Sequence, residues 1–333
     1  MKKILNKPEH FVDEMVEGIL LAHPDQVKTP GDDLRILVRA DAPVAGKVGI
    51  VTGGGSGHLP LFKGYVGKGL CHGVAIGNVF SSPSSQRCFE AIAAVNGGEG
   101  VLLLYGNYGG DVLNFDLATD QAELEDIAVR TVLGRDDVAS QPKDRKGDRR
   151  GVAGIFFAYK AAGAAAERGD NLEQVAAVAE DVVEHTATMG IGLSPTILPT
   201  TGSASFELPD GEMEIGIGIH GEPGIHRGEL DTADAIADRI VTALVDDLEL
   251  KSGDRVAALV NGLGATPLEE LYILYRRAHT VLSDLGVDIA KSYVGEYATS
   301  LEMAGASISL LALNDERLAL LNAPASSPFF QEF

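Results

Sequence analysis

Short apolar runs alternate with longer amphipathic stretches in the first half of the chain. The runs predict strands over residues 49–51, 74–76, 101–104 and 129–133. Between them, apolar spacing and alanine content predict helices over 85–95 and 151–168. Strands that alternate with helices are typical of an open, mainly parallel sheet with flanking helices. We therefore expect an α/β fold for this half.

Two further segments complete the first half. Segment 136–150 is rich in charged residues without periodicity, and we expect it to be a solvated surface loop. Asp170, followed by Glu173 at the third helical position, has the spacing of a variant capping box. This spacing predicts a helix that begins after Asp170 and ends near Gly190.

A domain boundary is expected after this helix. Residues 192–211 are dense in Ser, Thr, Pro and Gly, which disfavour a continuing helix. We therefore divide the chain into two α/β domains, residues 1–190 and residues 191–333. In the second domain the pattern predicts strands over 213–219, 255–260, 287–294 and 307–313, and helices over 232–248 and after 266–267.

Composition and charge exclude several classes of protein. The 333 residues are 45% hydrophobic, which suits two globular domains. The formal net charge of -21 would repel nucleic acid and anionic membranes, and no apolar run is long enough to cross a bilayer. The first residues lack the apolar core of a signal peptide, and Cys71 and Cys88 form no CxxC pair. We expect a cytoplasmic protein that binds neither nucleic acid nor membrane.

Three predicted strand ends carry a glycine-rich turn and a reactive side chain, at the edge where open α/β sheets bind ligands. The first is the loop 53–58, whose glycines let a ligand approach the backbone while His58 reaches the same rim. Its order matches neither GxGxxG nor GxxxxGK[ST], and a glycine turn that packs a helix onto the sheet explains it equally well. The second end carries Asp111, either an ordinary turn or cap residue or a base for a substrate hydroxyl.

The third strand end is the most informative. Alternation over 213–220 gives two faces, one with Met213, Ile215, Ile217 and Ile219 and the other with Glu214, Gly216, Gly218 and His220. The glycines would leave a smooth strip on which a small molecule could lie, with the imidazole at its end. This arrangement suits a ligand site better than a core histidine. His226 lies six residues after His220, but a metal site would need further ligands at a recognisable spacing, so we predict no metal site.

A fourth strand end, 260–267, lacks a good nucleophile or base. Thr266 has the position of an N-cap, and Pro267 that of the first helical residue. We interpret this segment as the start of a helix.

Motifs over nearly the whole chain resemble the K subunit of dihydroxyacetone kinase in order and spacing. They lie at residues 40–47, 53–58, 107–115, 216–224 and 259–268. The resemblance implies a two-domain α/β homodimer that binds a short ketose covalently, as a hemiaminal on an imidazole. By position that imidazole is His220. The resemblance also implies roles for His58 in substrate binding and for Asp111 as base, and places Gly54, Gly55, Ser56, Gly57 and Gly106 among the substrate-binding candidates.

The same resemblance implies where the phosphoryl donor is bound. The family's nucleotide sits on a separate helical L-type subunit or domain, so ATP or ADP with magnesium is expected on that partner and no cofactor on this chain. Phosphoryl transfer depends on positioning and on neutralising phosphate charge, and the sequence shows no motif for either. A phosphocarrier protein is the other possible donor.

Two residues depart from the dihydroxyacetone-specific pattern. Leu59 stands where that pattern has Glu, and Gly106 where it has Lys. Both departures resemble those in kinases for larger ketoses, such as erythrulose or apulose. Two other functions remain open at this point: a sugar sensor that acts on a transcription regulator, as some relatives do, and a phosphohistidine carrier that uses His220.

Overall fold

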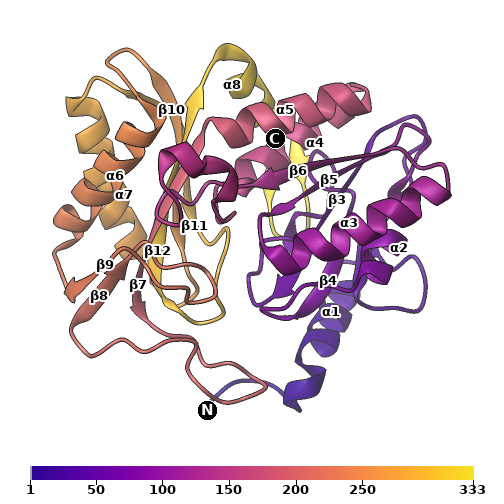
Figure 1. Cartoon of the computed structure of the whole chain (residues 1–333), viewed down its shortest axis with the longest axis horizontal. Helices are drawn as coiled ribbons and strands as arrows, with labels where there is room; N and C mark the ends of the chain where they lie inside the picture. The colour runs from indigo at the N-terminus through magenta and orange to yellow at the C-terminus, as the bar shows by residue number, and fades with distance from the viewer. Residues whose placement is uncertain (1) are drawn as a thin grey trace.

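The computed structural model describes residues 2–333 and contains two six-stranded sheets (Figure 1). The first has the order β1-β2-β4-β3-β5-β6 and consists of β1 (Val27–Lys28), β2 (Ile36–Arg39), β3 (Gly49–Ser56), β4 (Gly73–Val79), β5 (Val101–Gly106) and β6 (Val129–Gly134). Strands β4, β3, β5 and β6 are parallel, whereas β1 and β2 add antiparallel pairs at one edge. The predicted α/β fold with a mainly parallel first sheet is confirmed.

Helices cover both faces of the first sheet. They are α1 (Phe11–Ala22), α2 (Ser85–Val95), α3 (Gly109–Leu124), α4 (Ile155–Arg168) and α5 (Leu172–Glu184). Successive residues of β5 enter two different cores: Leu103 packs in a cluster with residues of α2 and α3, and Leu102 and Leu104 pack in the cluster that contains α4 and α5. This double burial explains why the central strands read as unbroken apolar runs.

The second sheet has the order β11-β10-β12-β7-β8-β9. It consists of β7 (Thr186–Ser194), β8 (Glu212–Ile215), β9 (His226–Glu229), β10 (Arg255–Gly262), β11 (Asp288–Gly295) and β12 (Ala304–Leu313), and its core includes α6 (Ala233–Leu248) and α7 (Leu268–Asp284). Only the pair β10–β11 is parallel within this sheet of the described chain. The chain closes with α8 (Asp315–Leu321) and the pair β13 (Ala325–Ser326) and β14 (Gln331–Glu332). None of the described helices is long and apolar enough to cross a membrane.

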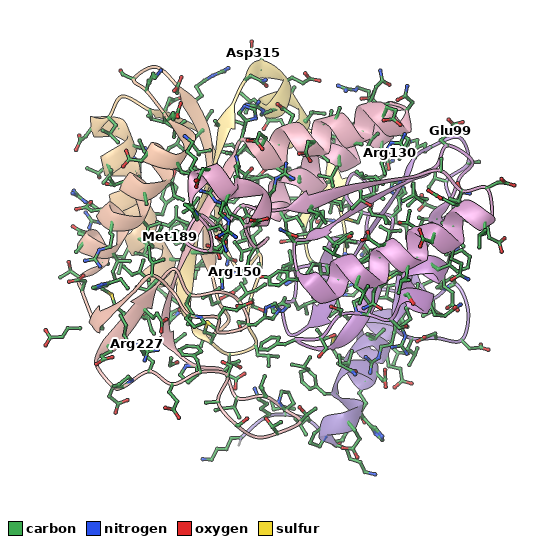
Figure 2. The ribbon with its side chains drawn as sticks, in the orientation of Figure 1. Glu99, Arg130, Arg150, Met189, Arg227 and Asp315 are labelled. Carbon is green, nitrogen blue, oxygen red and sulfur yellow. The ribbon has the colours of Figure 1, made fainter. Side chains whose placement is uncertain are left out.

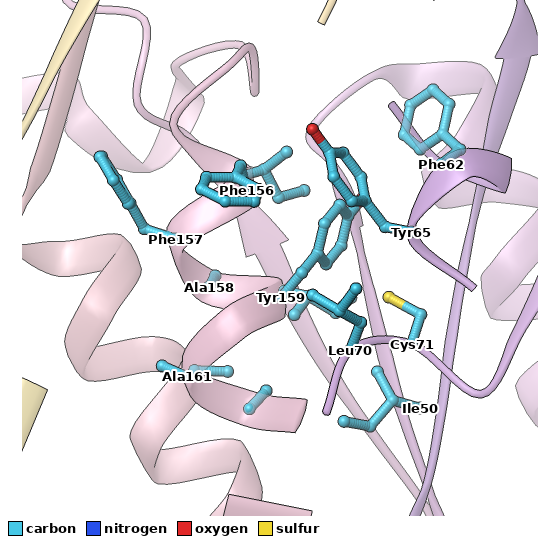
Figure 3. Packing of buried hydrophobic residues seen from close by; sticks show 14 of the residues in the cluster. Ile50, Phe62, Tyr65, Leu70, Cys71, Phe156, Phe157, Ala158, Tyr159 and Ala161 are labelled. Atoms are coloured by element: carbon cyan, nitrogen blue, oxygen red, sulfur yellow. The ribbon is translucent and has the colours of Figure 1, made fainter. Parts of the chain in front are cut away.

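Helix α4 joins the two halves of the molecule. Its residues 155–166 are all buried, because residues of the first sheet pack on one side and residues of the second half on the other. Phe156 contacts the rings of Tyr65, Tyr293 and Phe330 at centroid distances of 5.4, 5.1 and 5.2 Å. Figure 3 shows the side of this core formed by Tyr65, Leu70 and Cys71. Apart from Lys160, whose Nζ pairs with Glu332 at 2.8 Å, this stretch carries no charged residue, as is typical of an interior helix.

The helix after Asp170 differs from the prediction at both ends. Its N-cap is Asn171, which forms a capping box with Gln174 through two 3.0 Å hydrogen bonds. It ends at Glu184 rather than near Gly190, since Thr186 begins β7. The pairing of β7 with β12 and β8 overrides the local helical pattern. The predicted boundary near residue 190 thus falls inside a strand of the second sheet.

Two predictions for the second half are wrong in detail. The strand predicted over 213–219 ends at Ile215, because Gly216 turns the backbone with φ of +82°. The expected two faces do not form, and Ile219 packs instead in the core around α4. The N-cap of α7 is Pro267, while the Thr266 hydroxyl exchanges hydrogen bonds with the backbone of Gly305.

The prediction of a solvated loop over 136–150 is wrong at its two ends. Asp136 is buried and accepts hydrogen bonds from the backbone N–H groups of Val152 and Gly154, at 2.9 and 2.8 Å. Arg149 is 1% exposed and donates two hydrogen bonds to Asp247 of α6, at 2.9 and 2.7 Å. These buried charges hold the two ends of the segment in place between the two sheets. Figure 2 shows the neighbouring Arg150 near the centre of the molecule.

Replacing Asp247 with Asn is expected to destabilise the fold strongly. The change leaves the Arg149 guanidinium buried without its counter-charge, which costs about 3–5 kcal/mol in comparable buried pairs. Urea unfolding curves would measure the loss. Asp238→Asn on the same helix is the matched control, because its pair with Arg277 is partly exposed to solvent and should contribute little. Equal midpoints for the two variants would contradict the prediction.

Candidate functional site

Three predicted site residues from distant parts of the chain lie together between the two sheets. The rings of His58 and His220 meet edge to face, with centroids 4.8 Å apart. Asp111, in the first turn of α3, is close enough that the charge of His220 affects its pKa. His58 follows β3, Asp111 follows β5, and His220 lies in the loop after β8. The structure therefore brings together the ends of strands from both sheets.

The surroundings of His220 fix which ring nitrogen carries its proton. Nδ1 lies 2.8 Å from Oε1 of Glu222, and the backbone N–H of His220 donates to Oε2 of the same carboxylate at 3.0 Å. Burial alone would raise the pKa of Glu222, but the hydrogen bond from His220 and the charges of His220 and Arg150 lower it to about 2. An ionised Glu222 accepts a hydrogen bond from Nδ1–H, so the neutral form of the His220 ring has its lone pair on Nε2.

The tautomer of His58 follows from a backbone carbonyl. Its Nδ1 lies 2.8 Å from the carbonyl oxygen of Thr299, which only accepts hydrogen bonds. Burial holds the pKa of His58 well below its usual range, and the nearby charge of His220 lowers it further. The ring is therefore neutral, with Nδ1 as donor and Nε2 as acceptor. Nε2 is buried and has no hydrogen-bond partner among the described residues.

Asp111 is a buried carboxylate that performs no capping. Burial raises its pKa to about 6, partly offset by a hydrogen bond from Ser82 and by the charge of His220. Tyr108 is the N-cap of α3 and no side chain caps this helix end. Oδ1 of Asp111 is buried without a partner among the described residues. A buried carboxylate with a raised pKa and an unpaired oxygen is a candidate proton acceptor.

The glycine loop is packed closely under aromatic rings. A Cβ on Gly54 would lie 2.4 Å from the Phe62 ring, and one on Gly57 would lie 2.7 Å from the Phe80 ring. A Cβ on Gly55 would lie 2.7 Å from the backbone nitrogen of Ser81. The hydroxyl of Ser56 is buried and donates a hydrogen bond to the Gly77 carbonyl at 2.9 Å. These contacts explain the glycines by packing. Their contact with a substrate stays a prediction.

Two aromatic residues that sequence reasoning missed complete the walls of the site. Phe80 stacks on His58 at 4.9 Å and meets His220 edge on at 5.3 Å. Tyr108 meets His220 edge on at 4.9 Å, and its hydroxyl is buried without a partner among the described residues. No motif singles out Phe80. Tyr108 lies in the turn just before Asp111, and this position could have identified it as a site residue.

The glycines before His220 have a different purpose from the predicted smooth strip. A Cβ on Gly218 would lie 2.1 Å from Oε2 of Glu222 and 2.6 Å from Nη1 of Arg150. A Cβ on Gly216 would lie 2.6 Å from that of Ala139. The histidine that the sequence singled out does lie beside His58 and Tyr108, but these glycines make room for protein side chains. Glu222, two residues after His220, was the missed signal.

Residues far along the chain hold the loop that carries His58. The backbone N–H of Leu301 donates to the Gly57 carbonyl at 2.7 Å, and the Thr299 hydroxyl donates to the Leu59 carbonyl at 2.9 Å. Asn261 in turn shapes this segment, since its Oδ1 accepts from the backbone N–H groups of Tyr297 and Ala298. Asn261 therefore supports the segment that orients His58.

The resulting constellation places His220 beside three buried polar atoms that have no hydrogen-bond partner among the described residues. His220 offers an Nε2 lone pair, and the buried atoms without partners around it are Nε2 of His58, the hydroxyl of Tyr108 and Oδ1 of Asp111. Buried polar atoms are rarely left unpaired in native proteins. Such a set matches a small molecule with several hydroxyl groups and one electrophilic carbon.

Comparison with known proteins identifies the family. A model of the Dak1 domain matches residues 17–329. The chain belongs to the Dak1 domain family. Its relatives include the dihydroxyacetone-binding subunit DhaK of PTS-dependent dihydroxyacetone kinase 2 from Listeria innocua serovar 6a, 43% identical over 99% of both chains. The L-erythrulose kinase of Pectobacterium atrosepticum is 42% identical over 100% of this chain and 56% of that protein.

Solved structures agree with this assignment to the Dak1 domain family. The co-activator DhaQ of a dihydroxyacetone kinase operon superposes with a TM-score of 0.89 at 32% identity, covering 96% of this chain and 98% of that one. The resemblance inferred from sequence motifs is thus confirmed.

Proposed function

We propose that this Dak1-domain chain is the ketose-binding subunit of a ketose kinase. In this proposal His220 captures the carbonyl carbon of a short ketose, and Asp111 accepts the proton of the hydroxyl that becomes phosphorylated. The observation that carries it is the Nε2 lone pair of His220 facing a site with three orphaned polar atoms. The names of its relatives, a dihydroxyacetone-binding subunit and an erythrulose kinase, support the same substrate class.

The covalent step balances without a cofactor. Nε2 of His220 attacks the carbonyl carbon, a C–N bond forms, and the π electrons move to the carbonyl oxygen. That oxygen gains a proton and the imidazole loses its Nδ1 proton, so the ketose is retained whole as a hemiaminal and no water leaves. Glu222, ionised and bound to Nδ1, stabilises the positive charge that develops on the ring. An alcohol without a carbonyl group would be excluded.

In the second step Asp111 acts on the bound ketose. It accepts the proton of the terminal hydroxyl while that oxygen attacks the phosphorus of the donor, whose leaving group departs on the far side. His58 accepts a hydrogen bond from another substrate hydroxyl through Nε2. We propose that a separate L-type subunit holds the nucleotide with magnesium, and that the donor is either ATP or a phosphocarrier protein that converts bound ADP to ATP.

Intact-protein mass spectrometry tests the first step directly. The purified chain is incubated with dihydroxyacetone, erythrulose or apulose in the absence of any reductant. We expect one adduct that adds the whole mass of the ketose without loss of water. The polyol of the same carbon number serves as the control and should add nothing. Absence of an adduct with all three ketoses would refute the proposal.

Turnover is expected to depend on a partner. The purified chain with ATP, magnesium and ketose should form no ketose phosphate, because its sequence contains no recognisable nucleotide motif. Addition of an L-type protein with ATP, or of that protein with a phosphorylated carrier, should restore turnover in a coupled assay. ATP-dependent turnover by the highly purified single chain would contradict this prediction.

The substrate is predicted to be larger than dihydroxyacetone. Gly106 lies at the end of β5, where its Cβ would approach the Tyr108 ring to 3.2 Å, so a lysine at this position would press on a wall of the His220 site. Without that side chain, a tetrulose or apulose should have the higher kcat/KM, by about 1–3 kcal/mol per added carbon. Gly106→Lys should shift the ratio toward the triose.

Competition kinetics with the complete enzyme measures this preference. Gly18→Lys is the matched control, because Gly18 is exposed in α1 and a Cβ there would meet nothing within 4 Å. A preference of the unmodified enzyme for dihydroxyacetone over every larger ketose would rule out the prediction.

A sensor function is the second candidate, favoured by the similarity to the co-activator DhaQ. In that case the chain would form the same ketose adduct but would support no phosphorylation with any L-type partner, and would bind a transcription regulator. A phosphohistidine carrier would instead accumulate acid-labile phosphate on His220. The reconstituted assay separates the three functions.

A further inference from the structure

We infer that Asp137, Arg150 and Glu222 form a relay of charges that positions His220 for attack on the ketose. Arg150 would act through Glu222 and is a positioning residue, and Asp137 would hold Arg150. The inference rests on the proposed role of His220, and it goes beyond that role by assigning function to the segment 136–150. The sequence alone marked this segment only as surface.

Arg150 is held in place from the first half of the molecule. Its Nε and Nη2 atoms donate to Oδ2 of Asp137, at 2.9 and 2.8 Å. Asp137 is 2% exposed, and its Oδ1 accepts a hydrogen bond from the backbone N–H of Ala139 at 3.1 Å. A buried carboxylate with this many partners fixes the orientation of the guanidinium plane.

From this position Arg150 reaches the loop of the second half that carries His220. Nη2 donates to the Gly216 carbonyl at 3.3 Å, and Nη1 lies 3.8 Å from Oε2 of Glu222. Burial alone would raise the pKa of half-buried Glu222, but the hydrogen bond and charge of His220 and, after them, the charge of Arg150 lower it to about 2. Glu222 then holds both the ring and the backbone of His220. The chain of contacts is therefore continuous from Asp137 to the imidazole.

Gly218 gives independent evidence that the local structure depends on the contact between Arg150 and Glu222. It lies directly beneath the pair, and a Cβ there would be 2.1 Å from Oε2 of Glu222 and 2.6 Å from Nη1 of Arg150. Any other residue would force the carboxylate or the guanidinium aside. Gly218→Ala thus disrupts the relay by steric contact while leaving every charge in place.

The first test uses the protein without ketose. Nitrogen-15 NMR of the imidazoles distinguishes a proton on Nδ1 from one on Nε2, with His220→Asn used to assign the signal. We expect His220 to be the Nδ1–H tautomer in the unmodified chain. Arg150→Met and Gly218→Ala should mix the tautomers, whereas Arg150→Lys should preserve the Nδ1–H form in part. An unchanged tautomer in both disruptive variants would overturn the relay.

The second test follows ketose capture by intact mass. Arg150→Met should raise the ketose concentration for half-maximal adduct about 10- to 100-fold, the loss seen when groups that orient metal-binding histidines are removed. Arg317→Met is the control, since Arg317 forms a similar two-bond pair with Asp181 away from the site, at 2.6 and 2.7 Å. A similar shift in both variants would mean a general structural effect.

A double-mutant cycle separates positioning from structural support. In the reconstituted kinase, Arg150→Met should lower kcat/KM in the unmodified chain but cause no further loss in a His220→Ala background. Equal losses in both backgrounds would overturn the relay. If the unmodified chain forms no adduct with any ketose, the proposed function fails, and the tautomer measurement still decides whether the relay exists.

Discussion

Replacing His220 with Ala is expected to abolish the ketose adduct and to lower turnover of the reconstituted kinase by roughly two orders of magnitude or more. The imidazole is the group whose Nε2 lone pair is set up by Glu222 to attack the carbonyl carbon. Without the covalent bond the ketose loses the orientation of its hydroxyl toward Asp111, and misplacement of this kind costs about 10²-fold. Intact mass and a coupled assay give the two readouts.

The matched control for this variant is His226→Ala. His226 is an exposed histidine of β9 in the strand that follows the same loop, and it should leave both adduct and turnover unchanged. Circular dichroism should show the same fold for both variants, since His220 is a partly exposed loop residue. An adduct that persists in His220→Ala would assign the nucleophile to another side chain.

Asp111→Asn is expected to retain the adduct while turnover falls by roughly two to four orders of magnitude, the contribution of a well-placed general base. The amide has the size of the carboxylate but accepts no proton from the hydroxyl. Hence capture and phosphorylation should separate in this variant. Asp116→Asn, an exposed position on the same helix, is the control. Near-normal turnover would return Asp111 to a purely structural role.

The raised pKa of Asp111 also predicts the pH dependence of turnover. Burial favours the protonated carboxyl and raises its pKa to about 6, so the base form dominates above that pH and disappears below it. Turnover at saturating ketose should therefore fall as the pH drops through about 6, and the Asp111→Asn variant should lack this limb. The adduct fraction at each pH, measured by mass, distinguishes loss of base from loss of capture.

Several features could be predicted because they depend on neighbours in the sequence. The apolar runs of β3, β4 and β5 are buried on both faces, so the apolar pattern of these runs predicts the sheet directly. His58, Asp111 and His220 each follow an apolar run and a glycine, and all three lie together in the structure. The local pattern failed where pairing with a distant strand determines the structure. Residues 186–190 were predicted to continue a helix, but they pair with β12.

The candidate site itself was predicted as a set of residues but not as a chemical arrangement. His58 is oriented by the Thr299 carbonyl, 241 residues further along the chain, and the Glu222 carboxylate lies 3.8 Å from the guanidinium of Arg150, which belongs to the first half. The two members of each pair are far apart in the sequence, so no motif or residue spacing could predict that they meet. The glycines at 216 and 218 illustrate the same limit, because the side chains that fill their space come from other segments.

The sequence by itself determined the α/β class, the strand ends that carry reactive groups and membership of the Dak1 domain family, since apolar periodicity, turn residues and motif spacing belong to consecutive positions. Only the tertiary structure decided which nitrogen of each histidine is protonated, why Asp111 has a raised pKa, and how Asp137, Arg150 and Glu222 connect to His220. These properties depend on burial and on charges a few ångströms away, which the folded backbone supplies from both sheets.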